Sequence, residues 1–99
     1  MIPPGSHASV LNAPTKLTVS AARRTVTLHW SDRSNNEAGF YIERAPHSAK
    51  FARFAQVGAN VNTFTLTEPP GIFSYRVQAF NPATGQVSAY SNQVQVRVR

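Results

Sequence analysis

The stretch Thr25-Val26-Thr27-Leu28-His29-Trp30 decides the fold class. Its large apolar residues Val26, Leu28 and Trp30 alternate with polar ones, which is the period of a strand with one buried face. The same period runs through residues 16–20, 40–43, 63–67, 73–80 and 94–98, and more weakly through residues 51–57. Turn-forming residues separate these segments, so the sequence predicts an all-β sandwich of seven short antiparallel strands.

The composition agrees with a small β domain. The chain has 99 residues, of which 41% are hydrophobic and only 14% charged, and it has no cysteine. Helical surfaces are usually richer in charge, and without cysteine there is no disulfide scaffold, thiolate metal site or thiol nucleophile. No apolar run has the length of a transmembrane helix and no signal-peptide core is present, so membrane insertion is not expected.

The first ten residues show no strand or helix period, and Gly5-Ser6-His7 looks like a remnant of an expression vector. We expect residues 1–10 to be a disordered tail, partly vector-derived, and residues 11–99 to form the domain. The chain ends inside the strand pattern of residues 94–98. We therefore expect a module of a longer polypeptide.

Several segments resemble the fibronectin type III family, most of all its bacterial version in secreted and surface proteins. The second and third strands of that family are similar to LHWSDRSNNEAGFYIER (28–44), and its sixth strand to YRVQAFN (75–81). The start of its last strand is similar to SAYSNQV (88–94), and its opening to Pro14 with Leu17 and Val19. The resemblance covers roughly residues 12–98 and implies an immunoglobulin-like sandwich with sheets A-B-E and C′-C-F-G.

The resemblance places Trp30 at the centre of the core, and we expect these residues to be buried around it: Leu28, Ile42, Phe64, Tyr75 and Val77. One position departs from the family pattern. Phe73 stands where the family usually has a tyrosine whose hydroxyl bonds to the preceding loop. We expect a buried Phe73 ring, and Pro69 and Pro70 stiffening this corner in place of a hydroxyl.

The residues that could carry chemistry predict no catalytic, cofactor or metal site. His29, Ser31 and Asp32 follow one another in an extended segment, where side chains alternate in direction and do not converge. The loop 32–37 has the oxygen-rich rhythm of a calcium loop but only two carboxylates, which favours a self-bonded turn. The net charge is +6, yet the ten basic residues form no run and no recognition helix, so specific nucleic-acid binding is not expected.

The two outer faces of the predicted sandwich differ. The A-B-E face carries mostly hydroxyl side chains, as suits contact with solvent. The outer face of the C′-C-F-G sheet, here called the C-F-G face, is expected to expose Glu43, Gln95 and five candidate ligand residues: Tyr41, Phe80, Arg76, Gln78 and Arg97. Aromatic rings and arginines are enriched at interfaces, and antiparallel pairing should bring Tyr41 close to Phe80.

The resemblance implies a non-catalytic spacer or protein-interaction domain within a larger secreted or cell-surface bacterial protein. Its partners would then be the neighbouring domains of that protein, and we expect a monomer in isolation. The alternative is a carbohydrate- or acidic-polymer-binding module that uses the C-F-G face. Either function implies an extracellular or cell-surface location as part of a longer chain.

Overall fold

The computed structural model describes residues 11–34, 36–47 and 49–99, so the tail expected over residues 1–10 lies outside the described residues. No described segment forms a helix, and hence none forms one long and apolar enough to cross a membrane. The described residues form eight strands: β1 (Thr15–Ala22), β2 (Thr25–Ser31), β3 (Gly39–Pro46), β4 (Ala52–Gly58), β5 (Thr63–Thr67), β6 (Gly71–Asn81), β7 (Gln86–Tyr90) and β8 (Val94–Val98).

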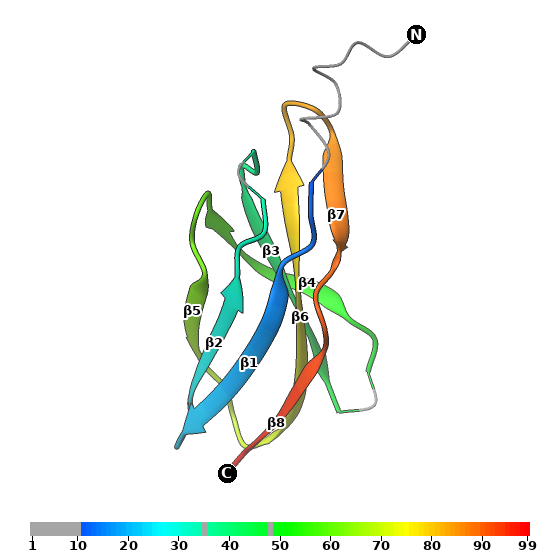
Figure 1. Ribbon diagram of the computed structural model, residues 1–99. Helices are drawn as coiled ribbons and strands as arrows, with labels where there is room; N and C mark the ends of the chain where they lie inside the picture. The colour runs from blue at the N-terminus through cyan, green and yellow to red at the C-terminus, as the bar shows by residue number, and fades with distance from the viewer. Residues whose placement is uncertain (1–10, 35, 48) are drawn as a thin grey trace, which may run out of the picture.

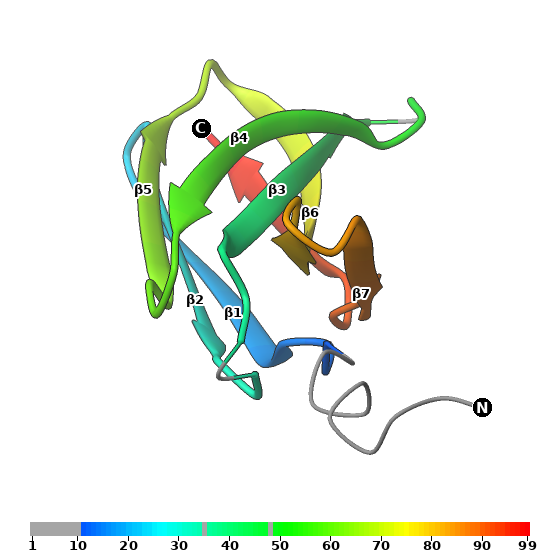
Figure 2. The ribbon, with the colours of Figure 1, turned by 90° about the horizontal axis from the view of Figure 1, so that it is seen from above.

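The strands form two antiparallel sheets that pack face to face (Figures 1 and 2). The three-stranded sheet has the order β1-β2-β5, and the five-stranded sheet has the order β4-β3-β6-β7 with β8 also paired to β6. This is the A-B-E and C′-C-F-G arrangement that the resemblance implied. The alternating pattern therefore predicted the fold class correctly.

The strand predicted over residues 94–98 is β8, and β7 comes before it as an additional strand. The last strand of the family, whose start the resemblance placed at residues 88–94, is thus divided in two, because side chains replace part of its backbone ladder to β6. The hydroxyl of Ser88 accepts the Ala79 N–H at 2.9 Å, and that of Ser91 accepts the Val77 N–H at 3.0 Å. Beyond this break, the Asn92 side chain accepts the Leu17 N–H and donates to the Leu17 carbonyl, at 2.9 and 3.0 Å. The break thus joins the edge of the five-stranded sheet to β1.

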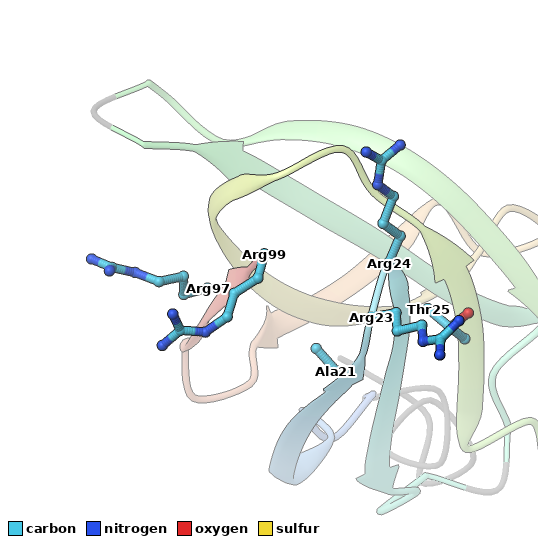
Figure 3. A pocket seen from close by; sticks show the side chains of 6 residues that line it. All are labelled: Ala21, Arg23, Arg24, Thr25, Arg97 and Arg99. Carbon is cyan, nitrogen blue, oxygen red and sulfur yellow. The ribbon is translucent and has the colours of Figure 1, made fainter.

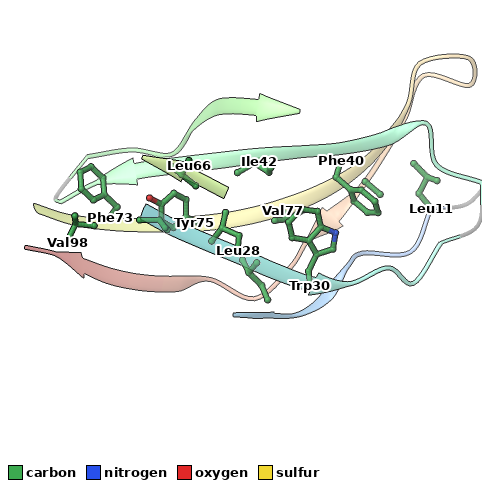
Figure 4. Packing of buried hydrophobic residues seen from close by; sticks show 13 residues of the cluster. Leu11, Leu28, Trp30, Phe40, Ile42, Leu66, Phe73, Tyr75, Val77 and Val98 are labelled. Atoms are coloured by element: carbon green, nitrogen blue, oxygen red, sulfur yellow. The ribbon is translucent and has the colours of Figure 1, made fainter. Parts of the chain in front are cut away.

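The core lies between the sheets and is centred on Trp30, which is 1% exposed (Figure 4). The ring of Phe40 meets the Trp30 indole edge to face, with centroids 5.6 Å apart. The predicted burial is confirmed for these residues: Leu28, Ile42, Tyr75 and Val77. Phe64 is only partly buried, because it lies on the edge strand β5 and packs against the core from one side.

A tyrosine hydroxyl does form a hydrogen bond at the corner before β6. Phe73 is buried as expected, but the Tyr75 hydroxyl donates to Oε2 of Glu68 at 2.5 Å. Arg44 donates to Oε1 of the same carboxylate at 2.8 Å, and the Glu68 N–H donates to the Arg24 carbonyl at 2.9 Å. The expectation that proline stiffening replaces a hydroxyl bond was therefore wrong. The donor is the hydroxyl of Tyr75, two positions after Phe73, and the acceptor is the side chain of Glu68.

Candidate interaction surface

The first pair of predicted ligand residues does meet on the C-F-G face, which is the outer face of the five-stranded sheet. The rings of Tyr41 in β3 and Phe80 in β6 stack with centroids 4.0 Å apart and planes 10° from parallel. Gly39 makes this possible, because it pairs with Phe80 across the two strands. A Cβ on Gly39 would lie 3.0 Å from the Phe80 ring, so the ring occupies the space that a side chain would take.

A second group on this face is built around the carboxylate of Glu43. Arg76, directly opposite on β6, reaches Oε1 with Nη2 at 2.7 Å and Nε at 2.8 Å. The Tyr90 hydroxyl donates to Oε2 at 2.9 Å. That hydrogen bond, partial burial and the negative charge of Glu43 raise the pKa of the Tyr90 hydroxyl. The guanidinium of Arg76 also lies between two rings, 3.7 Å from the centroid of Tyr90 and 4.3 Å from that of Phe51.

These contacts bury much of what the sequence predicted to be exposed. Phe80 is only 7% exposed, and Gln78 and Glu43 are buried as well. Gln78 donates to the Ser88 carbonyl at 2.8 Å, and the guanidinium of Arg53 lies 3.5 Å over the ring of Tyr41. The prediction that Phe80, Gln78 and Glu43 face solvent was wrong. Tyr41 of β3 stacks on Phe80, Gln78 bonds to β7, and Glu43 is bound by side chains of β6 and β7.

Arg97, the remaining candidate, lies on the same outer face but at the far end of the sheet from Tyr41 and Phe80. It lies towards the end of β8, opposite Ile72, and lines a concavity at that end of the sandwich (Figure 3). The other residues that line this concavity of about 760 Å³ are Ala21, Arg23, Arg24, Thr25 and Arg99. Arg97 thus joins three further arginines and is separated from Tyr41 and Phe80.

The loop between β2 and β3 is held by bonds to its own carboxylates. Oδ1 of Asp32 accepts the Ser34 N–H at 3.0 Å, which is the self-bonded turn expected for this segment. Oε2 of Glu37 accepts the Asn60 N–H at 2.9 Å. Burial, together with the neighbouring Glu37, raises the pKa of Asp32. Among residues 11–34, 36–47 and 49–99, no three histidine, aspartate or glutamate side chains gather as a metal site would require.

Several residues that form these surfaces could not be predicted from the sequence. Phe51 and Arg53 come from the weakly alternating segment, where a bulge between Ile42 and Glu43 shifts the pairing with β4. Arg23 and Arg24 lie in the turn between β1 and β2, and only the packing of β1 against β8 brings them near the end of the chain. A shift of register and a contact between distant segments are invisible to a period count.

No protein-family model and no curated protein matches the sequence. Solved structures do match it. A β-1,2-glucanase from Parabacteroides distasonis is 24% identical with a TM-score of 0.78, over 91% of this chain and 13% of that one. An Fn3-like protein from Clostridium thermocellum is 17% identical with a TM-score of 0.70, over 92% of this chain and 96% of that one.

The chicken CNTN1 FN1-FN3 domains are 19% identical with a TM-score of 0.75, over 90% of this chain and 31% of that one. The chain thus spans 13% of the glucanase and 31% of the CNTN1 chain. Likeness at these identities concerns the arrangement of strands. The chain has the fibronectin type III, immunoglobulin-like sandwich fold.

Proposed function

We propose that this chain is a non-catalytic module that acts as a spacer or interaction domain within a larger secreted or cell-surface bacterial protein. The observation that carries the proposal is the fixed pairing of two of its three buried glutamates. Glu68 is held by Tyr75 and Arg44, and Glu43 is held by Arg76 and Tyr90. A carboxylate held on both oxygens by structural partners is poorly placed to take part in acid or base chemistry.

The course of the chain supports the spacer function. Thr15 pairs with Ser31 at one end of β2, whereas Val98 pairs with Gly71 at the opposite end of the sandwich (Figure 1). Segments that flank such a domain are held apart by its full length. A sandwich with a continuous core resists bending, so it sets both distance and direction in a way that a flexible linker does not.

The similar structures support a role inside longer chains. The matching region is a small part of the glucanase and about a third of the CNTN1 chain. A fold of this kind hosts many functions, so the setting in a bacterial secreted or surface protein rests on the sequence resemblance.

The test is a replacement inside the full-length protein that contains this segment. In one version residues 11–99 are exchanged for an unrelated β-sandwich of similar length, and in another for a flexible glycine-serine linker. A spacer predicts that the sandwich restores the parent activity and that the linker does not. An interaction domain predicts that neither restores it while a partner is lost from pull-down. Loss of activity towards a small soluble substrate in the sandwich version would contradict the non-catalytic proposal.

A second candidate function is oligosaccharide binding on the C-F-G face. The observation that favours it is Tyr90, a large ring that is 38% exposed and backed by the guanidinium of Arg76. An exposed ring of this kind stacks well on a sugar. Arg76 is already engaged by Glu43, so this face suits a neutral sugar better than an acidic one. A titration with neutral oligosaccharides that shifts the Tyr90 signals would support it, and an unshifted spectrum would exclude it.

A further inference from the structure

The concavity lined by Arg23, Arg24, Arg97 and Arg99 has no part in the proposal above. We propose that this arginine cluster is a docking surface for an acidic polysaccharide, a chain that bears carboxylate or sulfate groups at regular intervals. The inference does not depend on the spacer function. Its failure would leave the module proposal in place.

The cluster is built by two segments that are far apart in the sequence. Arg23 and Arg24 form the turn between β1 and β2, where Arg23 has a left-handed φ of 58°. Arg97 and Arg99 come from the end of β8, and β1 and β8 lie against one another (Figure 1). All four arginines are exposed, and they line the concavity of about 760 Å³ together with Ala21 and Thr25.

The charge of this cluster is not neutralised by the acids of the chain. Glu68 lies nearest in the fold, but its carboxylate is 1% exposed and is bound by Arg44 and Tyr75. Glu43 is bound by Arg76. Asp32 and Glu37 follow the other end of β2, which at about 3.3 Å per residue is roughly 25 Å from the turn. Apart from the terminal carboxylate of Arg99, this end of the molecule therefore presents a positive field with no acidic group beside it.

The chemistry of the lining selects the class of ligand. Planar guanidinium groups bind carboxylate and sulfate through paired N–H donors and stay charged at every accessible pH. The lining residues include no aromatic ring, so bases of single-stranded nucleic acid find no stacking platform. They also include no large apolar side chain, which a protein hot spot would use.

The directions of the side chains favour a polymer over a small anion. In Figure 3, Arg97 and Arg99 extend to the same side of the concavity, whereas Arg23 and Arg24 extend in other directions. Four guanidinium groups that do not converge on one point cannot enclose a single sulfate or carboxylate. They can each meet a different charge of an extended chain that crosses this end of the sandwich.

The test compares charge-matched variants for binding to two probes, a size-fractionated dextran sulfate oligomer and an oligogalacturonate, by calorimetry at two salt concentrations. The variants are Arg23→Gln with Arg24→Gln, and Arg97→Gln with Arg99→Gln. Each pair is expected to lower the affinity roughly tenfold or more and to reduce the slope of log affinity against log salt by about 2. The control, Arg33→Gln with Lys50→Gln, removes the same charge from exposed positions elsewhere and is expected to change the affinity less than about twofold.

Equal losses in the control and in the cluster variants would overturn the proposal, because binding would then follow net charge alone. Tighter binding of single-stranded DNA than of either polysaccharide would overturn the ligand class. The same measurements are repeated on a chain extended by Gly-Ser-Gly after Arg99, because this extension moves the terminal carboxylate away from the cluster. The ranking of variants is expected to be unchanged there. Fluorescence of Trp30, which is buried in the core, checks that each variant is folded.

Discussion

Removing the Tyr75 hydroxyl tests the contribution of its hydrogen bond to Glu68, at the corner before β6, to stability. In Tyr75→Phe the ring stays in the core, but Oε2 of Glu68 loses a donor at 2.5 Å while its carboxylate stays 1% exposed. Hydrogen bonds to charged groups contribute about 1.5–3 kcal/mol, and an unpartnered buried oxygen adds to the loss. We therefore expect the free energy of unfolding to fall by about 2–3 kcal/mol. For a domain of this size that lowers Tm by roughly 8–20 °C.

The chain offers a matched control for this substitution. Tyr90→Phe removes the same hydroxyl from the same kind of contact, at 2.9 Å from Glu43, but Tyr90 is 38% exposed. Water can replace the lost donor there, so the expected cost is less than about 1 kcal/mol. Urea unfolding followed by the fluorescence of the single tryptophan measures both variants. The reasoning would be refuted if Tyr75→Phe were as stable as the parent, or if the two variants lost the same free energy of unfolding. In either case the buried hydrogen bond between Tyr75 and Glu68 would add no stability of its own.

Three further outcomes are expected from the same unfolding assay. Trp30→Ala should cost about 3–5 kcal/mol because it empties the centre of the core, with circular dichroism as the probe once the indole is gone. Gly39→Ala should cost about 1–3 kcal/mol because its Cβ would meet the backbone of β4 and a ring of β6, whereas Gly58→Ala, where the Cβ meets nothing within 4 Å, should be nearly neutral. Burial and nearby Glu37 raise the pKa of Asp32 above its ordinary 3.8, so the folded chain holds that proton more tightly than the unfolded chain. The stability that this site contributes is therefore present below pH 3.8 and is lost as the pH rises through the raised pKa. An asparagine side chain does not titrate, so the free energy of unfolding of Asp32→Asn should fall less than that of the parent as the pH rises over this interval.

Alternation predicted the strands and the core because burial of one sheet face imposes a strict period of two. Trp30, Leu28 and Ile42 are buried for that reason. The period says which side of a sheet a residue faces, but it does not say what lies over that side. Phe80 faces outwards as predicted and is nevertheless buried, because its neighbour Tyr41 stacks on it.

Features that depend on single side chains were beyond the reach of the pattern. The last strand breaks where the hydroxyls of Ser88 and Ser91 take two backbone donors of β6, and nothing in an alternating run marks that exchange. At the corner before β6 the hydrogen bond is made by Tyr75, and not by position 73, because the carboxylate of Glu68 lies within reach of the Tyr75 hydroxyl. Arg97 was expected among the ligand residues of the C-F-G face. Its pairing with Ile72 puts it on that face, but at the end where the packing of β8 beside β1 brings it near Arg23 and Arg24.

The central claim is that Tyr41, Gln78 and Phe80 of the C-F-G face are held by contacts within the protein, whereas Tyr90 on the same face is exposed. The most direct test is a chemical-shift titration of the folded chain with a neutral and a sulfated oligosaccharide. The account predicts that the signals of Tyr41, Gln78 and Phe80 stay in place with both ligands. Saturable shifts at these three residues would contradict it and would make the face a ligand-binding site.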